Sequence, residues 1–283
     1  MHRWSFEAIG TPWHIDTAAE PSAALRATIT DTIRRFDEDW SRFRDDSLVS
    51  RLGRAGGGVP APADTTAMLD AYRALSAATD GAVNPLVGGA LEALGYDSAL
   101  TLRPGEPRPA PPDWTRMLRW TASELTLDGT AVIDVGALGK GRLVDVVTGL
   151  LAGLGGLVVV DGSGDLRVRG GAQRVALEHP YDPRRAIGVV EVADAALCAS
   201  AVNRRAWGDG LHHVLDARTG LPVRRWAATW AVAEEAMQAD AVATALFFDG
   251  GADLAAQWGV HWVRMTTDGR VQRSRGWEGE LFT

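Results

Sequence analysis

The stretch from Asp134 to Gly141 joins a predicted strand to a predicted helix and carries Lys140 at the start of that helix. Backbone N–H groups at a helix N-terminus, together with a lysine ammonium, can hold an anion. The stretch is not a P-loop, because Asp134 replaces the first glycine of G-x-x-x-x-G-K-[ST] and Gly141 replaces the final hydroxyl residue. It predicts either an anion site or a glycine-rich turn with a solvated lysine.

A second polar stretch, Asp161-Gly-Ser-Gly-Asp165, directly follows the apolar run LVVVD. Ligand crevices in α/β folds lie just beyond the ends of such central strands. Glycine and aspartate are also the default residues of tight turns. Either a ligand crevice or a simple turn between two strands is therefore expected here.

Asp240 and Thr244 stand four residues apart in a predicted helix, so their side chains share one face. Carboxylate and hydroxyl oxygens suit a hard cation such as Mg²⁺, which completes its octahedron with water, carbonyl and phosphate oxygens. The alternative is a threonine bonded back to its own helix and an aspartate that caps a neighbouring element.

Two consecutive histidines, His212 and His213, come shortly before Asp216 and Arg218. Strand alternation points the two imidazoles to opposite faces, so at most one of them is expected at a shared site. Periodicity does not choose between them. A pair of this kind has either a structural or a catalytic role.

The elements that position these residues alternate between helix and strand along the 283-residue chain. Apolar spacing predicts helices over about 22–38, 65–79, 140–154 and 235–247, with Asp64 or Thr65 as the N-cap of the second. Strands are expected at WSFEAIG, TPWHID, MLRW, LTLD, TAVID, LVVVD, DLRVRG, QRVALEH, GVVEV, ALCAS, HHVLD, WAATWAVA, VHWVRM and RVQ. The pattern is that of a mixed α/β chain.

Two segments are predicted to be exposed loops because they are rich in glycine and proline. They are GRAGGGVPAPAD, at 53–64, and the proline-rich surface loop at about 101–113. Neither marks a domain boundary, so residues 1–283 are expected to form a single domain.

Composition excludes several classes of protein. The formal net charge of −7 argues against sequence-independent nucleic-acid binding, which requires a positive field. No apolar run approaches the roughly 20 residues needed to cross a bilayer, so no membrane insertion is expected. Cys198 is the only cysteine, which excludes an internal disulfide. The N-terminal residues lack the features of a secretory signal, and we expect a cytoplasmic location.

Taken in order, these stretches resemble the ApbE family of flavin transferases, which move FMN from FAD onto a hydroxyl of another protein. AIGT is similar to A-M-G-T, WSRFRDDSLVSRL to S-x-Y-x-x-x-S-x-[LI]-S-x-[LF], and TDGAVNPLVG to T-x-G-A-F-D-P. IDVGALGKGRLVD resembles D-x-[GS]-[AG]-[IL]-x-K-G-x-x-x-D, and DGSGDL resembles N-x-G-G-D-[IL]. HVLDARTGLP and ADAVATALF are similar to H-[IV]-[IL]-D-P-x-T-G-x-P and A-D-A-L-A-T-A-x-F. Together these motifs cover nearly the whole chain.

The resemblance implies a single α/β domain of the ApbE type, related to the T-fold, with mixed β-sheets flanked by helices. It implies Mg²⁺-dependent transfer of FMN from FAD to a threonine or serine of an acceptor protein, with release of AMP. His213, Lys140 and Asp240 would be catalytic, and Mg²⁺ would be held by Ala137, Asp240 and Thr244. The residues expected to bind FAD are Ile9, Phe43, Ala82, Val83, Asn84, Asp134, Ala137, Lys140 and Val214.

The chain departs from the family pattern in the flavin pocket. Ile9 replaces a methionine, Phe43 a tyrosine, and Val83-Asn84 a Phe-Asp pair. Met237 stands where some members carry a second metal-binding aspartate. Two alternatives follow: a Mg²⁺-dependent FAD pyrophosphatase that uses water as acceptor, or a flavin-binding protein without catalytic activity.

Overall fold

The computed structural model describes residues 1–282 and is organised around an eight-stranded antiparallel sheet. Its strand order is β1-β2-β6-β7-β10-β15-β16-β17. The bounds of these strands are β1 His2–Ala8, β2 Thr11–Thr17, β6 Val158–Asp161, β7 Asp165–Arg169, β10 Ala196–Ala201, β15 Trp226–Ala233, β16 His261–Thr266 and β17 Val271–Arg273. The mixed fold of helices and sheets expected from the sequence is confirmed.

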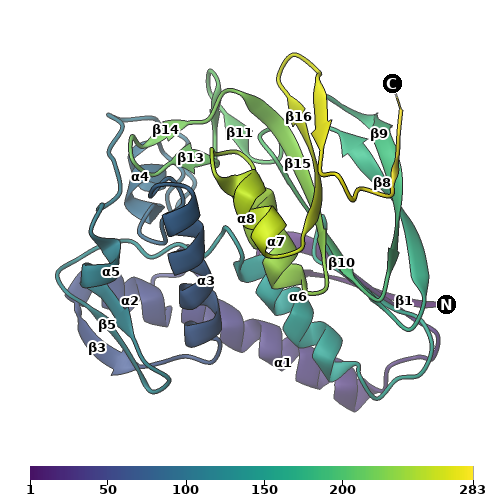
Figure 1. Cartoon of the computed structure of the whole chain (residues 1–283). Helices are drawn as coiled ribbons and strands as arrows, with labels where there is room; N and C mark the ends of the chain where they lie inside the picture. Colours follow the sequence, from purple (N-terminus) through teal and green to yellow (C-terminus); the bar gives the residue numbers. More distant parts are fainter. Residues whose placement is uncertain (283) are drawn as a thin grey trace.

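Helices cover one face of this sheet, and a smaller sheet covers the other (Figure 1). The helices are α1 Ala23–Trp40, α6 Gly139–Leu150, α7 Ala236–Ala245 and α8 Gly251–Gln257. The smaller sheet has the order β18-β9-β8, with bounds β8 Ala172–His179, β9 Asp182–Ala193 and β18 Glu280–Leu281. Strand β15 is buried along nearly its whole length because both of its faces are packed.

A second group of short helices and strands lies beside the helical layer (Figure 1) and encloses an apolar core of its own. It is built from α2 Leu48–Ala55, β3 Gly57–Pro60, α3 Thr65–Ala78, α4 Gly88–Ala93, α5 Trp114–Met117, β4 Leu118–Trp120 and β5 Glu124–Leu127. The strands form a sheet of order β3-β5-β4. Residues of α7 contribute to this core as well as to the core under the large sheet, so α7 joins the two.

The predicted helices are confirmed with shifted ends. Ser22 caps α1, since its hydroxyl accepts the Leu25 N–H at 3.2 Å. Asp64 precedes α3 but does not cap it, because its carboxylate instead accepts Arg142 Nη2 at 2.6 Å. The helix predicted over 140–154 ends at Leu150, where a turn begins before Gly155.

Three expectations about strands are wrong. Residues 57–60, predicted as part of a loop, form β3 because they pair with β5. The TAVID segment is not a strand; Asp134 N donates to Pro85 O in an irregular stretch that leads into α6. The predicted HHVLD strand is broken into β12 Leu211–His212 and β13 Leu215–Asp216, which pair with β11 Ala206–Trp207 and β14 Leu221–Pro222 respectively.

The proline-rich segment 101–113 has almost no regular structure and is mostly exposed. It is nevertheless attached to the histidine-bearing region, because Ala110 N donates to Ala217 O at 2.7 Å. Within residues 1–282, no helix is both long enough and apolar enough to cross a membrane.

Candidate active site

Lys140 and two buried carboxylates meet where α6 lies against α7 and β7. Lys140 Nζ lies 3.1 Å from Asp165 Oδ2 and donates to Ser163 O at 3.0 Å. The Gly141 N–H donates to Asp240 Oδ2 at 3.0 Å. The alternative of a turn with a solvated lysine is wrong, because Lys140 Nζ is paired with Asp165 and Ser163 O. Asp165, at the end of the stretch expected to form either a ligand crevice or a turn, is the partner of Lys140.

Charge is crowded at this centre. Burial, followed by the negative charge of Asp165, raises the pKa of Asp240 well above its usual range. Burial by itself lowers the pKa of Lys140, but Asp165 and Asp240 together hold it above its ordinary value. One ammonium therefore serves two carboxyl groups that are each at most 4% exposed. A further cation at this position would relieve the repulsion.

Close packing of α6 on α7 is possible because residue 141 is glycine. A Cβ atom at Gly141 would lie 2.3 Å from Ala236 O and 2.7 Å from Asp240 Cβ. Any larger residue would separate the two helices and break the bond from Gly141 N to Asp240. The glycine that departs from the P-loop pattern is thus required by the packing.

Ala137 and Thr244 are also brought together. Thr244 Oγ1 donates to Ala137 O at 3.2 Å, so the threonine points across to the neighbouring segment and does not bond back to its own helix. The buried Tyr72 hydroxyl donates to Asp134 O at 3.0 Å and accepts the Ala137 N–H at 3.2 Å. The turn before α6 is therefore fixed from α3 and α7 at once.

Asp145, which carried no expected role, anchors the start of α7. Its two carboxylate oxygens accept the N–H groups of Ala236 and Met237, each at 2.8 Å, and Oδ1 also accepts Arg167 Nη1 at 2.6 Å. Burial raises the pKa of Asp145 in spite of these bonds. A carboxylate at a helix N-terminus is favourable. The only signal in the sequence was the position of Asp145 at the end of the IDVGALGKGRLVD motif.

Asp134 is held by Arg42, a second residue without an expected role. Arg42 Nε donates to Asp134 Oδ2 at 2.5 Å and Nη1 donates to Tyr96 O at 2.8 Å. The guanidinium of Arg42 also lies over the ring of Phe43, 4.1 Å from its centroid. The Gly136 N–H completes the contacts by donating to Asp134 Oδ1 at 2.7 Å.

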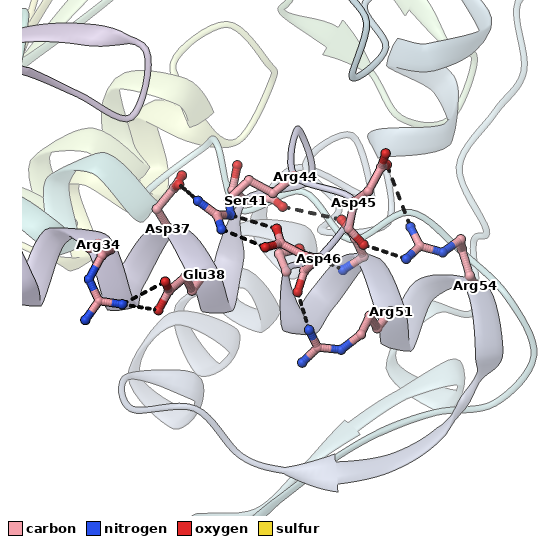
Figure 2. A network of polar contacts seen from close by, with 11 residues as sticks. Arg34, Asp37, Glu38, Ser41, Arg44, Asp45, Asp46, Arg51 and Arg54 are labelled. Carbon is pink, nitrogen blue, oxygen red and sulfur yellow. Dashed lines mark hydrogen bonds and ion pairs between the residues drawn. The ribbon is translucent and has the colours of Figure 1, made fainter.

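The segment that joins α1 to α2 contains Arg42, and a network of ion pairs holds it in place (Figure 2). Arg44 contacts Asp37 at 3.2 Å and Asp46 at 2.9 Å, and Arg51 donates to the Asp46 carbonyl. The Ser47 hydroxyl accepts the Ser50 N–H at 3.1 Å and caps α2. These contacts hold the segment from which Arg42 reaches Asp134.

The apolar residues expected to bind FAD lie in three different surroundings. Ala82, Val83 and Val214 are buried in the core beside the helical layer, whereas Phe43 is 37% exposed. Ile9 packs against the core under the large sheet with a positive φ of 46°. Their roles in binding FAD stay predictions.

Asn84 is tied into the protein itself. Its Nδ2 donates to Pro111 O at 2.8 Å and its Oδ1 accepts the Leu86 N–H at 2.8 Å. Each polar atom of this buried side chain thus has a protein partner. The aspartate of the family pattern could not donate to Pro111 O.

The two histidines differ in their surroundings. His212 Nε2 lies 2.8 Å from Val223 O, and Nδ1 accepts the Val214 N–H at 3.3 Å, so His212 is a structural residue. His213 Nδ1 is buried without a hydrogen-bond partner among residues 1–282. Burial, then the charge of Arg205, lowers the pKa of His213 from 6.5 to about 3. Its imidazole is therefore neutral near pH 7.

Oxygen atoms dominate the centre between α6 and α7. Among the described residues, no group of three or more histidine, cysteine, aspartate or glutamate side chains could hold a metal ion. The Ala137 carbonyl, the Thr244 hydroxyl and the Asp240 carboxylate are instead hard oxygen donors of mixed type. Such a set suits a cation that keeps water and phosphate oxygens in its shell.

Comparison with known proteins gives a consistent result. A model described as the ApbE family matches residues 9–262. A curated FAD:protein FMN transferase of Rhodobacter capsulatus is 27% identical over 302 residues, and the match covers 94% of this chain. The chain spans only 56% of the length of that relative.

Solved structures show the same fold. The ApbE protein of Thermotoga maritima has a TM-score of 0.83 at 21% identity, over 97% of each chain. The flavin transferase ApbE of Vibrio cholerae has a TM-score of 0.79 at 22% identity, also over 97% of each chain.

Proposed function

This chain belongs to the ApbE family, and we propose that it transfers FMN from FAD to an acceptor protein, the activity named for its curated relative. The observation that carries the proposal is the meeting of Lys140, Asp165 and Asp240 beside the Ala137–Thr244 contact. An ammonium and a set of hard oxygen donors are what a pyrophosphate and its counter-cation require.

We further propose that the acceptor group is a threonine or serine hydroxyl. Its oxygen attacks the FMN-side phosphorus of FAD, and the bond from that phosphorus to the oxygen of the adenosine phosphate breaks. The flavin remains on the protein as a phosphodiester, and AMP leaves. The proton of the attacking hydroxyl passes to a base and then to solvent.

Lys140 is the residue of this chain that would neutralise charge on the leaving phosphate. Its pKa is held above the ordinary value by Asp165 and Asp240, so it stays protonated throughout the neutral range. Asp165 also fixes its direction. We assign His213 to the acceptor side, where a neutral imidazole can accept a hydrogen bond from the hydroxyl. The negative charge of bound FAD would raise its low pKa toward the range of a useful base.

We propose Mg²⁺ as the cation, held by Ala137 O, Asp240 and Thr244 Oγ1. When bound, Mg²⁺ stabilises negative charge on the pyrophosphate. Asp134, held by Arg42, is proposed to position the flavin nucleotide beside it. The cytoplasmic location stays a prediction, which fractionation of cells would test.

The proposal can be tested by incubating the purified protein with FAD and a candidate flavin-carrying redox protein. One sample contains Mg²⁺ and the other a chelator. AMP measured by chromatography and covalent flavin measured by fluorescence in a denaturing gel should both depend on Mg²⁺. FAD binding, followed by quenching of tryptophan fluorescence, without turnover under any divalent metal would instead favour a flavin-binding protein.

A further inference from the structure

Arginines gather on three segments, two of which lie directly beside the histidine pair while the third is joined to them by an ion pair. The segments 178–185, 203–210 and 224–225 carry six arginines against three carboxylates, in a chain whose net charge is −7. Arg204 pairs with Glu178 at 3.0 Å and so ties the first two segments together. Among residues 1–282, Arg185, Arg205 and Arg224 form no ion pair, and all three are exposed. The local charge is thus opposite to that of the whole protein.

Hydrogen bonds place two of these arginines next to the histidines. The His213 N–H donates to Arg205 O at 3.2 Å. Val223, bonded to His212 Nε2 at 2.8 Å, directly precedes Arg224. Burial is the main cause of the lowered pKa of each histidine. The charge of Arg205 lowers the pKa of His213 further, and the charge of Arg224 lowers the pKa of His212. Positive charge therefore lies beside both histidines.

The loop that carries Arg205 is anchored. Trp207 is buried, its Nε1 donates to Leu94 O at 2.9 Å, and its ring stacks on Tyr96 with centroids 5.3 Å apart. Arg205 lies two residues from this anchor on an exposed stretch. A surface held in this way loses little conformational entropy when a partner binds.

The turn between β8 and β9 adds an exposed aromatic ring. Tyr181 is 54% exposed at the tip. Glu178 pairs with Ala186 and His179 with Asp182, so residues 183–185 bulge out of the ladder and present Arg184 and Arg185 to solvent. Tyrosine and arginine are the residues enriched at the centres of protein interfaces.

We propose that Tyr181, Arg184, Arg185, Arg205 and Arg224, here called the arginine surface, dock an acidic segment of the acceptor protein beside its reactive hydroxyl. The inference rests on the proposed transfer. Lys140, the residue proposed to contact the pyrophosphate, is half-buried against Asp165, whereas the arginine surface is made of exposed side chains from loops and from the start of β9. It fits an extended chain with carboxylates better than a compact nucleotide, and complementary charge favours encounter of the correct partner.

Docking would also act on His213. A partner carboxylate paired with Arg205 offsets the positive charge that contributes to the low pKa of His213. The imidazole then becomes a better proton acceptor at the moment when the hydroxyl arrives.

Two fluorescent peptides of equal length test the proposal. Each contains one threonine, which is flanked by aspartates in the first peptide and by lysines in the second. Anisotropy with the full chain should show the aspartate peptide binding at least about tenfold more tightly at low salt, and weakening as salt is added. Arg205→Glu/Arg224→Glu should remove this preference. Arg35→Glu/Arg116→Glu, the same charge change at two exposed arginines of α1 and α5, should leave it within about twofold.

Equal binding of the two peptides to the wild-type chain would overturn the proposal, as would loss of the preference in the control variant. FAD affinity, measured by tryptophan quenching, should stay unchanged in Arg205→Glu/Arg224→Glu. A matching loss of FAD affinity would assign the arginines to the nucleotide and contradict the proposal. Because these readouts need no turnover, failure of the transfer reaction itself is seen separately, as absence of AMP from wild-type protein with FAD and Mg²⁺.

Discussion

The centre between α6 and α7 and the segment around His213 are built in different ways. At the centre, Lys140, Asp165 and Asp240 are carried by regular helix and strand and are fixed by contacts at about 3 Å. His213 stands between strands of two residues each, with exposed loops on both sides. The side chains of the first region are held by partners within the protein. The second offers a surface that a protein partner can complete.

In the proposed transfer, this difference would divide two tasks between the two regions. Charge stabilisation requires groups that do not reorganise during the reaction, which the buried centre provides. Acceptance of a large partner requires exposed side chains, which the histidine region provides. At neutral pH, substitutions at the centre should therefore affect stability and chemistry together, while those near His213 should affect mainly acceptor binding and transfer.

Asp240→Asn is expected to have the largest effect. The side chain keeps its size and can still accept the Gly141 N–H, but it loses the charge that a metal requires. We expect about a 10³-fold loss of Mg²⁺-dependent AMP release, since metal stabilisation of a transferring phosphoryl group is worth several kcal/mol. Asp253→Asn, on the exposed side of α8, serves as the control. Undiminished activity in Asp240→Asn, or activity insensitive to chelator, would remove the metal assignment.

Lys140→Met should destabilise the protein as well as inactivate it. Removal of one partner of a buried ion pair leaves the carboxyl groups of Asp165 and Asp240 without a cation, which costs about 3 kcal/mol. Urea denaturation measures this loss. Adding Asp165→Asn to Lys140→Met should recover part of it, because the double variant no longer buries the uncompensated charge. Strictly additive losses would show that the pair is not coupled.

His213→Gln tests the other region. We expect roughly a 10²-fold slower transfer with FAD affinity nearly unchanged, the usual range for loss of a general base. Equal losses of transfer rate and of FAD affinity would make His213 a structural residue.

The same variant has a pH signature. Because the folded pKa of His213 is about 3 against 6.5 for the free side chain, the unfolded chain binds a proton that the folded chain does not. Wild-type stability should therefore fall relative to His213→Gln as pH decreases below about 6.5. Urea denaturation of both proteins at pH 7.5 and pH 5.0 would detect this change. A difference in unfolding free energy that is the same at both pH values would contradict the buried environment of His213.

Phe43→Tyr should have the smallest effect. The ring is 37% exposed, so the added hydroxyl can reach water, and we expect a change in stability within about 0.5 kcal/mol. FAD affinity should change less than about threefold. A large gain in affinity would show that the residue found in the family pattern is required for the flavin pocket.

What the sequence predicted well was local. Asp240 and Thr244 were placed on one helical face by their spacing, and both do face the segment between Ala137 and Gly141. Lys140 was placed at the start of α6 by the strand-to-helix pattern. Patterns of this kind depend on a few neighbouring residues, so a single sequence is enough to reveal them.

What the sequence did not predict depends on distant partners. Asp145 accepts N–H groups more than 90 residues away, and Arg42 reaches Asp134 across a similar separation. The periodicity of the sequence does not predict contacts between residues so far apart. The HHVLD segment looked like one strand because its residues alternate, but its backbone is divided between two small sheets, and the bonds of His212 to Val223 and Val214 hold that break in place.

The most direct test of the account is the ratio of AMP released to flavin covalently bound, in FAD and Mg²⁺, with and without a candidate acceptor protein. The account predicts one AMP for each covalent flavin and negligible AMP when the acceptor is omitted. Rapid AMP release without acceptor, or AMP in large excess over bound flavin, would contradict it and identify the protein as an FAD pyrophosphatase.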